Sequence, residues 1–213
     1  MKNVFVFMFA LLCLISCSKH NNFPPISCQL PEKEKIVNNI EIIKTIYIDS
    51  RFNASEKLAI ITAKNEWQNS TKEIIKFNLI FDFKINLEDK IPKKTVLMKL
   101  NSSDNIVNKL DEEIGEDFIS GTMISPNVEL ILVVPDRVKN TSELKKNMMK
   151  ELGHSLGLPT IKEEIYPAIM NEFTPDVDCL TKYDLTLFCA KYLCNAKELN
   201  YCDFKSKNRI NKL

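Results

Sequence analysis

The order of strand-like and helix-like segments is the feature that most constrains the fold of this chain. Runs rich in β-branched and aromatic residues predict five strands. The last of them has so few polar residues that burial on both faces of a sheet is expected. The polar and acidic stretch Asn101 to Asp117 is expected to form a long loop with no more than a helical turn. The predicted strands are Ile42 to Ile48, Ile74 to Phe83, Thr95 to Leu100, Gly121 to Ile124 and Val128 to Val134.

Three helices are expected around these strands, and residues suited to capping mark their ends. Asn53 and Glu56 have the spacing of a capping box, which opens the first helix. Thr141 or Ser142 caps the second helix, and Gly157 ends it, as a glycine just past a helix end commonly does. The helices are predicted from about Asn53 to Ser70, from Thr141 or Ser142 to about Leu156, and from Leu180 to Cys194.

The N-terminus has the pattern of an export signal that ends at a lipidated cysteine. Lys2 precedes the apolar run Val4 to Ile15, which is too short to span a bilayer and fits the core of a signal peptide. The following Ser16-Cys17 completes a sequence that resembles a bacterial lipobox, in which cleavage precedes the cysteine. Acyl chains such as palmitate on Cys17 would then anchor the protein to a membrane. An ordinary signal peptide cleaved nearby, with Cys17 incidental, is the alternative.

This pattern divides the chain into three parts. Residues 1–16 are the expected lipoprotein signal peptide, residues 17–34 a tether rich in Asn and Pro, and residues 35–213 a single globular domain. The expected location is the bacterial cell envelope, with a lipid anchor. Ser18 follows the cysteine. In the lipoprotein sorting rule of enterobacteria, the absence of Asp at this position favours the outer membrane.

Charge and cysteine content bound the kinds of partner and the compartment. The chain has 29 basic and 28 acidic residues, and removal of Lys2 with the signal leaves 28 of each, so nucleic acid is not an expected partner. Five of the seven cysteines stay in the exported domain. An exported compartment permits disulfides, and four cysteines crowd the last 35 residues, so at least one bridge is expected there. The pairing is left open. The bridging candidates are Cys28, Cys179, Cys189, Cys194 and Cys202.

The segment Lys150 to Thr160 resembles the active-site helix and turn of metzincin zinc metallopeptidases of the matrixin-like branch. The family pattern is H-E-x-x-H-x-x-G-x-x-H, and Glu151, His154 and Gly157 match it. Lys150 and Thr160 stand where the first and third histidines belong. The zinc-binding motif is therefore degenerate.

Three further segments carry the same resemblance in the family's order. Ala59 to Ala63, followed by Glu66-Trp67 and Ile75 to Phe77, is similar to the first helix and second strand. Ala168 to Asn171 resembles the Met-turn, in which Met170 would pack beneath the metal, and Leu180 to Leu185 resembles the start of the C-terminal helix. The resemblance implies a metzincin-like zincin fold of the α/β (α+β) class. It has a mixed twisted sheet, two long helices and a small Cys-containing C-terminal subdomain.

In this family two histidines four residues apart, and a third after the glycine, hold zinc, and the zinc lowers the pKa of a bound water. The glutamate removes the proton from that water. Here Glu151 would be a vestigial general base and His154 a vestigial ligand, because His20 lies in the tether and offers no substitute. The ammonium of Lys150 opposes a cation and has no lone pair, and Thr160 offers only a neutral hydroxyl.

These departures favour a catalytically impaired pseudopeptidase on a membrane-anchored lipoprotein, which binds a peptide or protein segment in its cleft without a cofactor. One alternative is an active zinc metalloendopeptidase with unconventional ligands, such as His154 with Glu151 or Asp178. Another is a structural or interaction lipoprotein whose cleft is merely inherited. The more ordinary interpretations are that Glu151 is a buried ion-pair or backbone partner, His154 a packed imidazole and Met170 a core residue.

Overall fold

The computed structural model describes residues 41–84, 95–124, 129–162, 166–172 and 177–203 of the 213-residue chain. All of them belong to one compact unit, Val37–Leu213. The expected signal peptide, the lipidation site Cys17, the tether and Cys28 lie outside the described residues. Within the described ranges, no helix is long and apolar enough to cross a bilayer.

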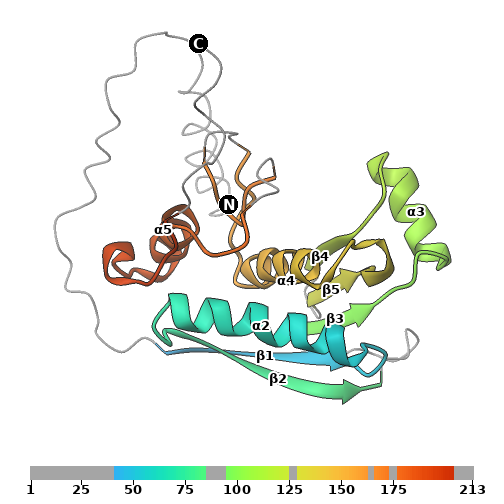
Figure 1. Ribbon diagram of the computed structural model, residues 1–213, viewed down its shortest axis with the longest axis horizontal. Coiled ribbons are helices and arrows are strands. Elements are labelled where there is room, and N and C mark those ends of the chain that lie inside the picture. Colours follow the sequence, from blue (N-terminus) through green and yellow to red (C-terminus); the bar gives the residue numbers. More distant parts are fainter. Residues whose placement is uncertain (1–40, 85–94, 125–128, 163–165, 173–176, 204–213) are drawn as a thin grey trace, which may run out of the picture. The chain divides into compact units, whose positions relative to one another are not determined.

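A mixed sheet of five strands forms the centre of the described domain (Figure 1). The strands lie in the order β2, β1, β3, β5, β4; the first four are parallel, and β4 runs antiparallel to β5 at one edge. All five predicted strands are confirmed to within one residue at each end. Their bounds are β1 Ile42–Asp49, β2 Ile75–Phe83, β3 Thr95–Lys99, β4 Ser120–Ile124 and β5 Glu129–Val133.

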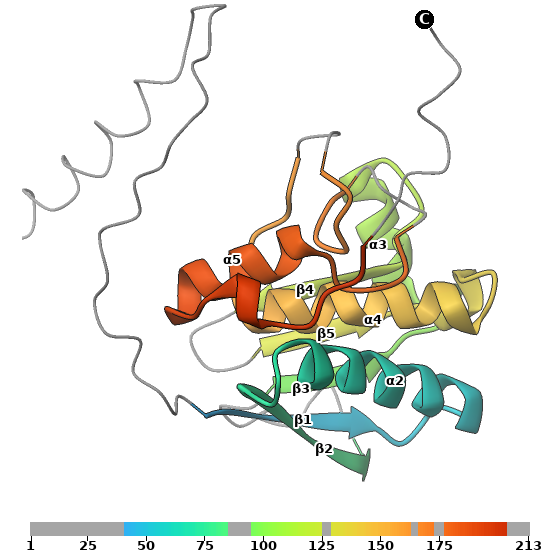
Figure 2. The same ribbon diagram turned by 60° about the vertical axis from the view of Figure 1, so that its left-hand side comes forward.

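Two long helices, α2 (Ala54–Ser70) and α4 (Thr141–Ser155), lie together on one side of the sheet (Figure 2). The predicted capping box of α2 is confirmed, since Asn53 accepts from the backbone N–H of Glu56 and the Glu56 carboxylate accepts in return. Trp67 is fully buried at the contact between the helices, and its indole N–H donates to the carbonyl oxygen of Met149 at 2.8 Å. This hydrogen bond joins the two helices within the core.

The start of α4 differs from the prediction by one residue. Its N-cap is Asn140, whose side-chain oxygen accepts a hydrogen bond from the Glu143 backbone N–H at 3.0 Å. Thr141 is therefore the first helical residue, and neither Thr141 nor Ser142 is the cap. The sequence Asn-Thr-Ser presents three residues that all cap well, so the local pattern alone did not decide among them.

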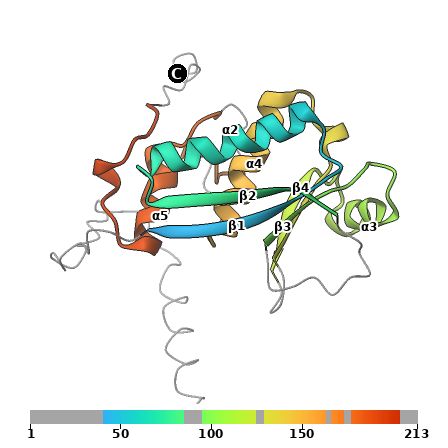
Figure 3. The same cartoon turned by 90° about the horizontal axis from the view of Figure 1, so that it is seen from below.

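The predicted loop from Asn101 to Asp117 is wrong, because it contains the ten-residue helix α3 (Asn105–Ile114). Figure 3 shows α3 and α5 at opposite ends of the sheet. Val107 of α3 is fully buried, and Gly115 ends the helix with a φ of 74°. The helix forms because it covers a second small apolar cluster, made by Met98, Leu100, Phe118, Leu132 and Val134.

The C-terminal part contains α5 (Lys182–Tyr192) and two disulfides, Cys179–Cys202 and Cys189–Cys194. The expectation of at least one bridge here is confirmed, and the pairing is one that the sequence left open. Phe188 of α5 is fully buried against Trp67, with their rings 6.2 Å apart, so this part shares the main core. The mixed sheet, the two long helices and the small Cys-containing C-terminal part confirm the predicted fold class.

Candidate functional site

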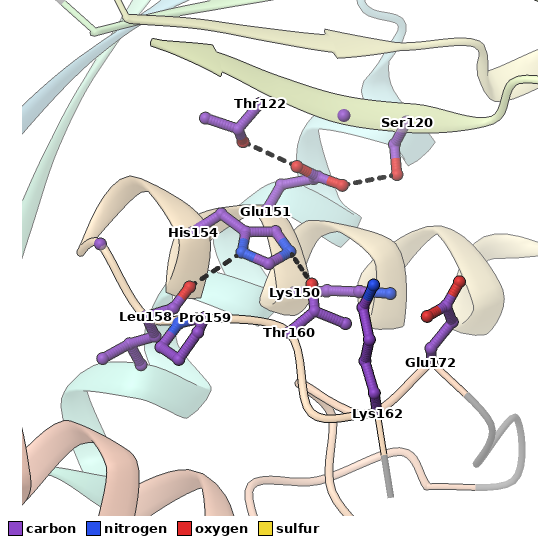
Figure 4. Close-up of a pocket in the computed structure, with 12 residues that line it drawn as sticks. Ser120, Thr122, Lys150, Glu151, His154, Leu158, Pro159, Thr160, Lys162 and Glu172 are labelled. Carbon is purple, nitrogen blue, oxygen red and sulfur yellow. Dashed lines mark hydrogen bonds between the residues drawn. The ribbon is translucent and has the colours of Figure 1, made fainter. Parts of the chain in front are cut away.

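A cleft of about 620 Å³ lies between β4, α4 and the loop that follows α4 (Figure 4). Ser120, Gly121 and Thr122 of β4 all line it. Ser120 and Thr122 lie two residues apart and direct their side chains to the same face, toward Glu151, and Gly121 between them offers only backbone. β4 pairs with β5 on one side only in the described sheet, and its other edge carries backbone groups that are free to bond.

Glu151 sits at the base of this cleft and is tied to β4. Its side chain is 3% exposed, and its two oxygens accept hydrogen bonds from the hydroxyls of Ser120 at 2.9 Å and Thr122 at 2.7 Å. Of the two interpretations of Glu151, a buried carboxylate with hydrogen-bond partners agrees better with these contacts than a general base does. The partners are hydroxyl groups, whereas Lys, Arg or backbone N–H groups were expected. These hydroxyl partners were not foreseen from the sequence, since nothing local pairs positions about 30 residues apart.

His154 also faces the cleft, three residues further along α4. Its Nδ1 lies 3.0 Å from the carbonyl oxygen of Leu158, which can only accept, so Nδ1 carries the proton in the neutral ring. Nε2 is then the lone-pair nitrogen, and it lies 3.5 Å from the Thr160 hydroxyl. This is the tautomer that a metal-binding histidine adopts when its second nitrogen donates to a carbonyl.

The turn after α4 brings Thr160 back to His154. Gly157 has a φ of 72°, a left-handed conformation that a side chain would strain, and its retention fits the predicted helix end. The last carbonyls of a helix have no partner within it, and here two of them accept hydrogen bonds from side chains of other elements. The Lys44 ammonium donates to the Ser155 oxygen at 2.6 Å, and the Tyr192 hydroxyl donates to the Leu156 oxygen at 2.8 Å. These contacts hold the end of α4, from which the turn to Thr160 begins.

The segment predicted to resemble a Met-turn lies beneath α4. Met170 is fully buried, as expected for a core residue, and a Cβ on Gly153 would lie 2.4 Å from its sulfur. The two segments are close-packed at this point, which only glycine allows. The Ile161 N–H donates to the Met170 oxygen at 2.7 Å, so the chain after Thr160 is paired with the Met-turn.

Asp184 holds the Met-turn from the other side. Its buried carboxylate accepts from the backbone N–H groups of Ile169, Met170 and Thr181 at 2.8–3.1 Å, and from the Thr181 hydroxyl at 3.0 Å. Burial raises the pKa of Asp184 above its ordinary value, and the four donors oppose that rise. Thr181 and Asp184 have capping-box spacing, so the sequence contained a signal for the contact between these two residues. It contained none for the contacts of Asp184 with Ile169 and Met170.

The residues present do not fit a zinc ion. Of the three positions that hold the metal in the family pattern, only His154 offers a nitrogen lone pair; Lys150 donates hydrogen bonds only, and Thr160 is a neutral hydroxyl. Asp178, an alternative ligand in the sequence analysis, is exposed and does not line the cleft. The described ranges contain no group of three His, Cys, Asp or Glu side chains arranged to hold a metal.

Lys150 also borders a second hollow of about 160 Å³, and Lys150 and Glu172 line both this hollow and the cleft. Asn147, one helical turn before Lys150, lines this hollow. Its side-chain nitrogen is buried and has no hydrogen-bond partner within the described part of the chain. A buried donor without an acceptor is rare in folded proteins.

Comparison with known proteins gives few matches. No protein-family model matches the chain, and no curated protein matches it. Among solved structures, high choriolytic enzyme 1, a hatching-enzyme zinc protease from the medaka fish Oryzias latipes, is similar at 12% identity and a TM-score of 0.45. That alignment covers 76% of this chain and 94% of that one. The fold class above rests on the strand order and on the packed segments of this chain.

Proposed function

We propose that this protein is a membrane-anchored lipoprotein whose metallopeptidase-like domain binds an extended peptide or protein segment and does not cleave it. Cys17 carries the lipid anchor, and the cell envelope is the location. The occupant lies in the cleft between β4 and α4. A zinc-dependent peptidase is the less favoured function, since only His154 among the three family positions is an ordinary zinc ligand.

One observation carries this proposal. The cleft is lined by β4, whose outer edge pairs with no other described strand, while the Glu151 carboxylate that would assist hydrolysis is bound to two hydroxyls. An extended segment that adds to a strand edge binds through its backbone and needs no metal. Glu151, the position of the general base, is bound by two β4 hydroxyls. Hydrolysis by this route requires that the carboxylate face an activated water instead.

The rigidity of the cleft's walls supports binding as well. β4 is fixed by its ladder to β5 and by the Ser120 and Thr122 hydrogen bonds to α4. The opposite wall is fixed by the pairing of Ile161 with the Met-turn. A preformed groove loses less conformational entropy on binding than one that must be ordered by its ligand.

The test is binding of the full-length protein, purified in detergent without affinity histidines, to an immobilised library of defined decapeptides. We expect binding that a chelator does not change and that leaves the peptides intact. The variant Thr160→Trp, which fills the cleft, should abolish it, whereas Lys109→Trp on the exposed surface of α3 should not.

Two results would contradict the proposal. Chelator-sensitive hydrolysis that Glu151→Ala abolishes would establish a working metallopeptidase. Peptide binding that is the same for Thr160→Trp and the wild type would place the binding surface outside the cleft. It would favour an interaction lipoprotein whose cleft is merely inherited.

A further inference from the structure

Lys150 and Lys162 both line the cleft, and neither has a partner among the residues that the structure describes. Neither Lys150 nor Lys162 has a hydrogen bond or ion pair to any side chain or backbone group in the part of the chain that the structure describes, and both line the cleft. Figure 4 shows both side chains extending into the region beside Thr160. Other lysines on the same elements and on the sheet are paired, such as Lys145 with Glu66 at 3.7 Å and Lys99 with Glu56 at 2.8 Å.

The acidic groups that line the cleft do not neutralise these two ammonium groups. The Glu151 carboxylate is directed at the β4 hydroxyls and lies 3% exposed. Glu172 is exposed and makes no ion pair within 4.0 Å to either lysine. Lys150 is half-buried, so its charge is screened less by solvent than that of a fully exposed lysine.

From these contacts, and resting on the function proposed above, we propose that the cleft selects a segment bearing a carboxylate, which Lys150 and Lys162 bind. Two unpaired cations in a concave site attract an anion, and a charge-assisted hydrogen bond to a carboxylate is about twice as strong as one between neutral groups. Lys150, in the position of a zinc-binding histidine, thus supplies the positive charge of the site, and the ligand supplies the oxygen atoms.

The dimensions of the site fit such a ligand. The five residues of β4 present an edge of about 17 Å at about 3.4 Å per residue, so a bound strand has about five residues along it. The carboxylate comes from a chain terminus or from an Asp or Glu side chain. The 160 Å³ hollow beside Lys150 has room for a short side chain, and Asn147, which lines it, adds a donor that has no acceptor among the described residues. Glu143 and Glu172 line the hollow as well, and the Glu143 carboxylate accepts from the Lys139 N–H.

The test measures the affinity of the best decapeptides from the library in four forms: free acid or C-terminal amide, each with its acidic residues intact or replaced by Asn and Gln. The full-length protein is compared with Lys150→Met, Lys162→Met and, as the matched control on α3, Lys109→Met. We expect Lys150→Met to weaken binding about tenfold or more, and loss of one carboxylate to weaken it by a similar factor. The two losses should not add, because they remove the same contact.

The terminal-amide and the Asn/Gln forms identify which carboxylate is bound. If peptides bind and Thr160→Trp removes that binding, yet affinity is the same for all four forms and for Lys150→Met, the carboxylate proposal is wrong and the peptide-binding function stands. If no peptide binds at all, both proposals are wrong. Equal unfolding temperatures for the Met variants and the wild type exclude a folding defect as the cause.

Discussion

The double variant Lys150→His/Thr160→His should gain a zinc site, because we expect α4 and the turn after it to hold positions 150, 154 and 160 around a common point. His154 already presents its Nε2 lone pair to the cleft, and the side chain of residue 160 faces it at 3.5 Å. Ligand atoms of a tetrahedral zinc site, with bonds of about 2.0–2.1 Å, lie about 3.3 Å apart. Residue 160 is therefore directed at the region where a metal on His154 would lie, and a small shift of the loop admits the longer imidazole.

The expected magnitude follows from linkage. Zinc at a hundredfold excess over its dissociation constant stabilises the folded state by about 2.7 kcal/mol. For a domain of this size about 1 kcal/mol shifts Tm by roughly 2–4 °C, so the variant should gain about 5–10 °C in excess zinc. Thermal unfolding with and without zinc, and elemental mass spectrometry for zinc per chain, are the measurements. The wild type should show no zinc-dependent shift and a metal content near zero.

Lys150→Asn/Thr160→Asn is the matched control, since it changes the same positions without adding imidazoles. A double-histidine variant that is as stable as the wild type but gains neither zinc nor Tm would refute the reasoning. The helix and turn would then not hold the three positions around a common point. Near-stoichiometric zinc in the wild type would refute the interpretation of the cleft as a site without metal.

Three further predictions concern the packing and charges that support the site. Gly153→Ala should lower the free energy of unfolding in urea by about 1–3 kcal/mol, because its methyl group would meet the Met170 sulfur at 2.4 Å; an unchanged midpoint would contradict the close packing. Asp184→Asn should cost about 1–3 kcal/mol and speed amide exchange at Met170, as one acceptor oxygen is lost from a buried set of four hydrogen bonds. Hydrogen bonds from Arg137 and from a backbone N–H lower the pKa of Asp111 from 3.8 to about 2. The stability from Asp111 should therefore be present above pH 3.8 and be lost as the pH falls through about 2; a carboxyl NMR titration midpoint near 3.8 would show that the ion pair is absent.

The elements of the fold were predictable wherever a pattern local in sequence also decides the structure. The strands, the capping box at Asn53 and Glu56, and the helix end at Gly157 depend on residues within a turn or a strand length of one another. The two errors have different causes. The apolar residues of α3 have helical spacing, and Gly115 ends the helix, but the polar and acidic composition of Asn101–Asp117 led to the prediction of a loop. The cap of α4 was one of three adjacent candidates.

The sequence by itself determined that Lys150 and Thr160, and not histidines, stand at the spacings from His154 that the zinc-binding pattern assigns to its other two ligands. Only the tertiary structure decided which contacts the residues of this site make. It brought Ser120 and Thr122 to Glu151 and placed Asp184 under the Met-turn. It also placed Lys150 and Lys162 in one cleft, with no partner for either in the described ranges. The tertiary structure also determined that the cysteines pair as Cys179–Cys202 and Cys189–Cys194. Such contacts join residues far apart in the chain, and no local propensity encodes which distant elements will meet.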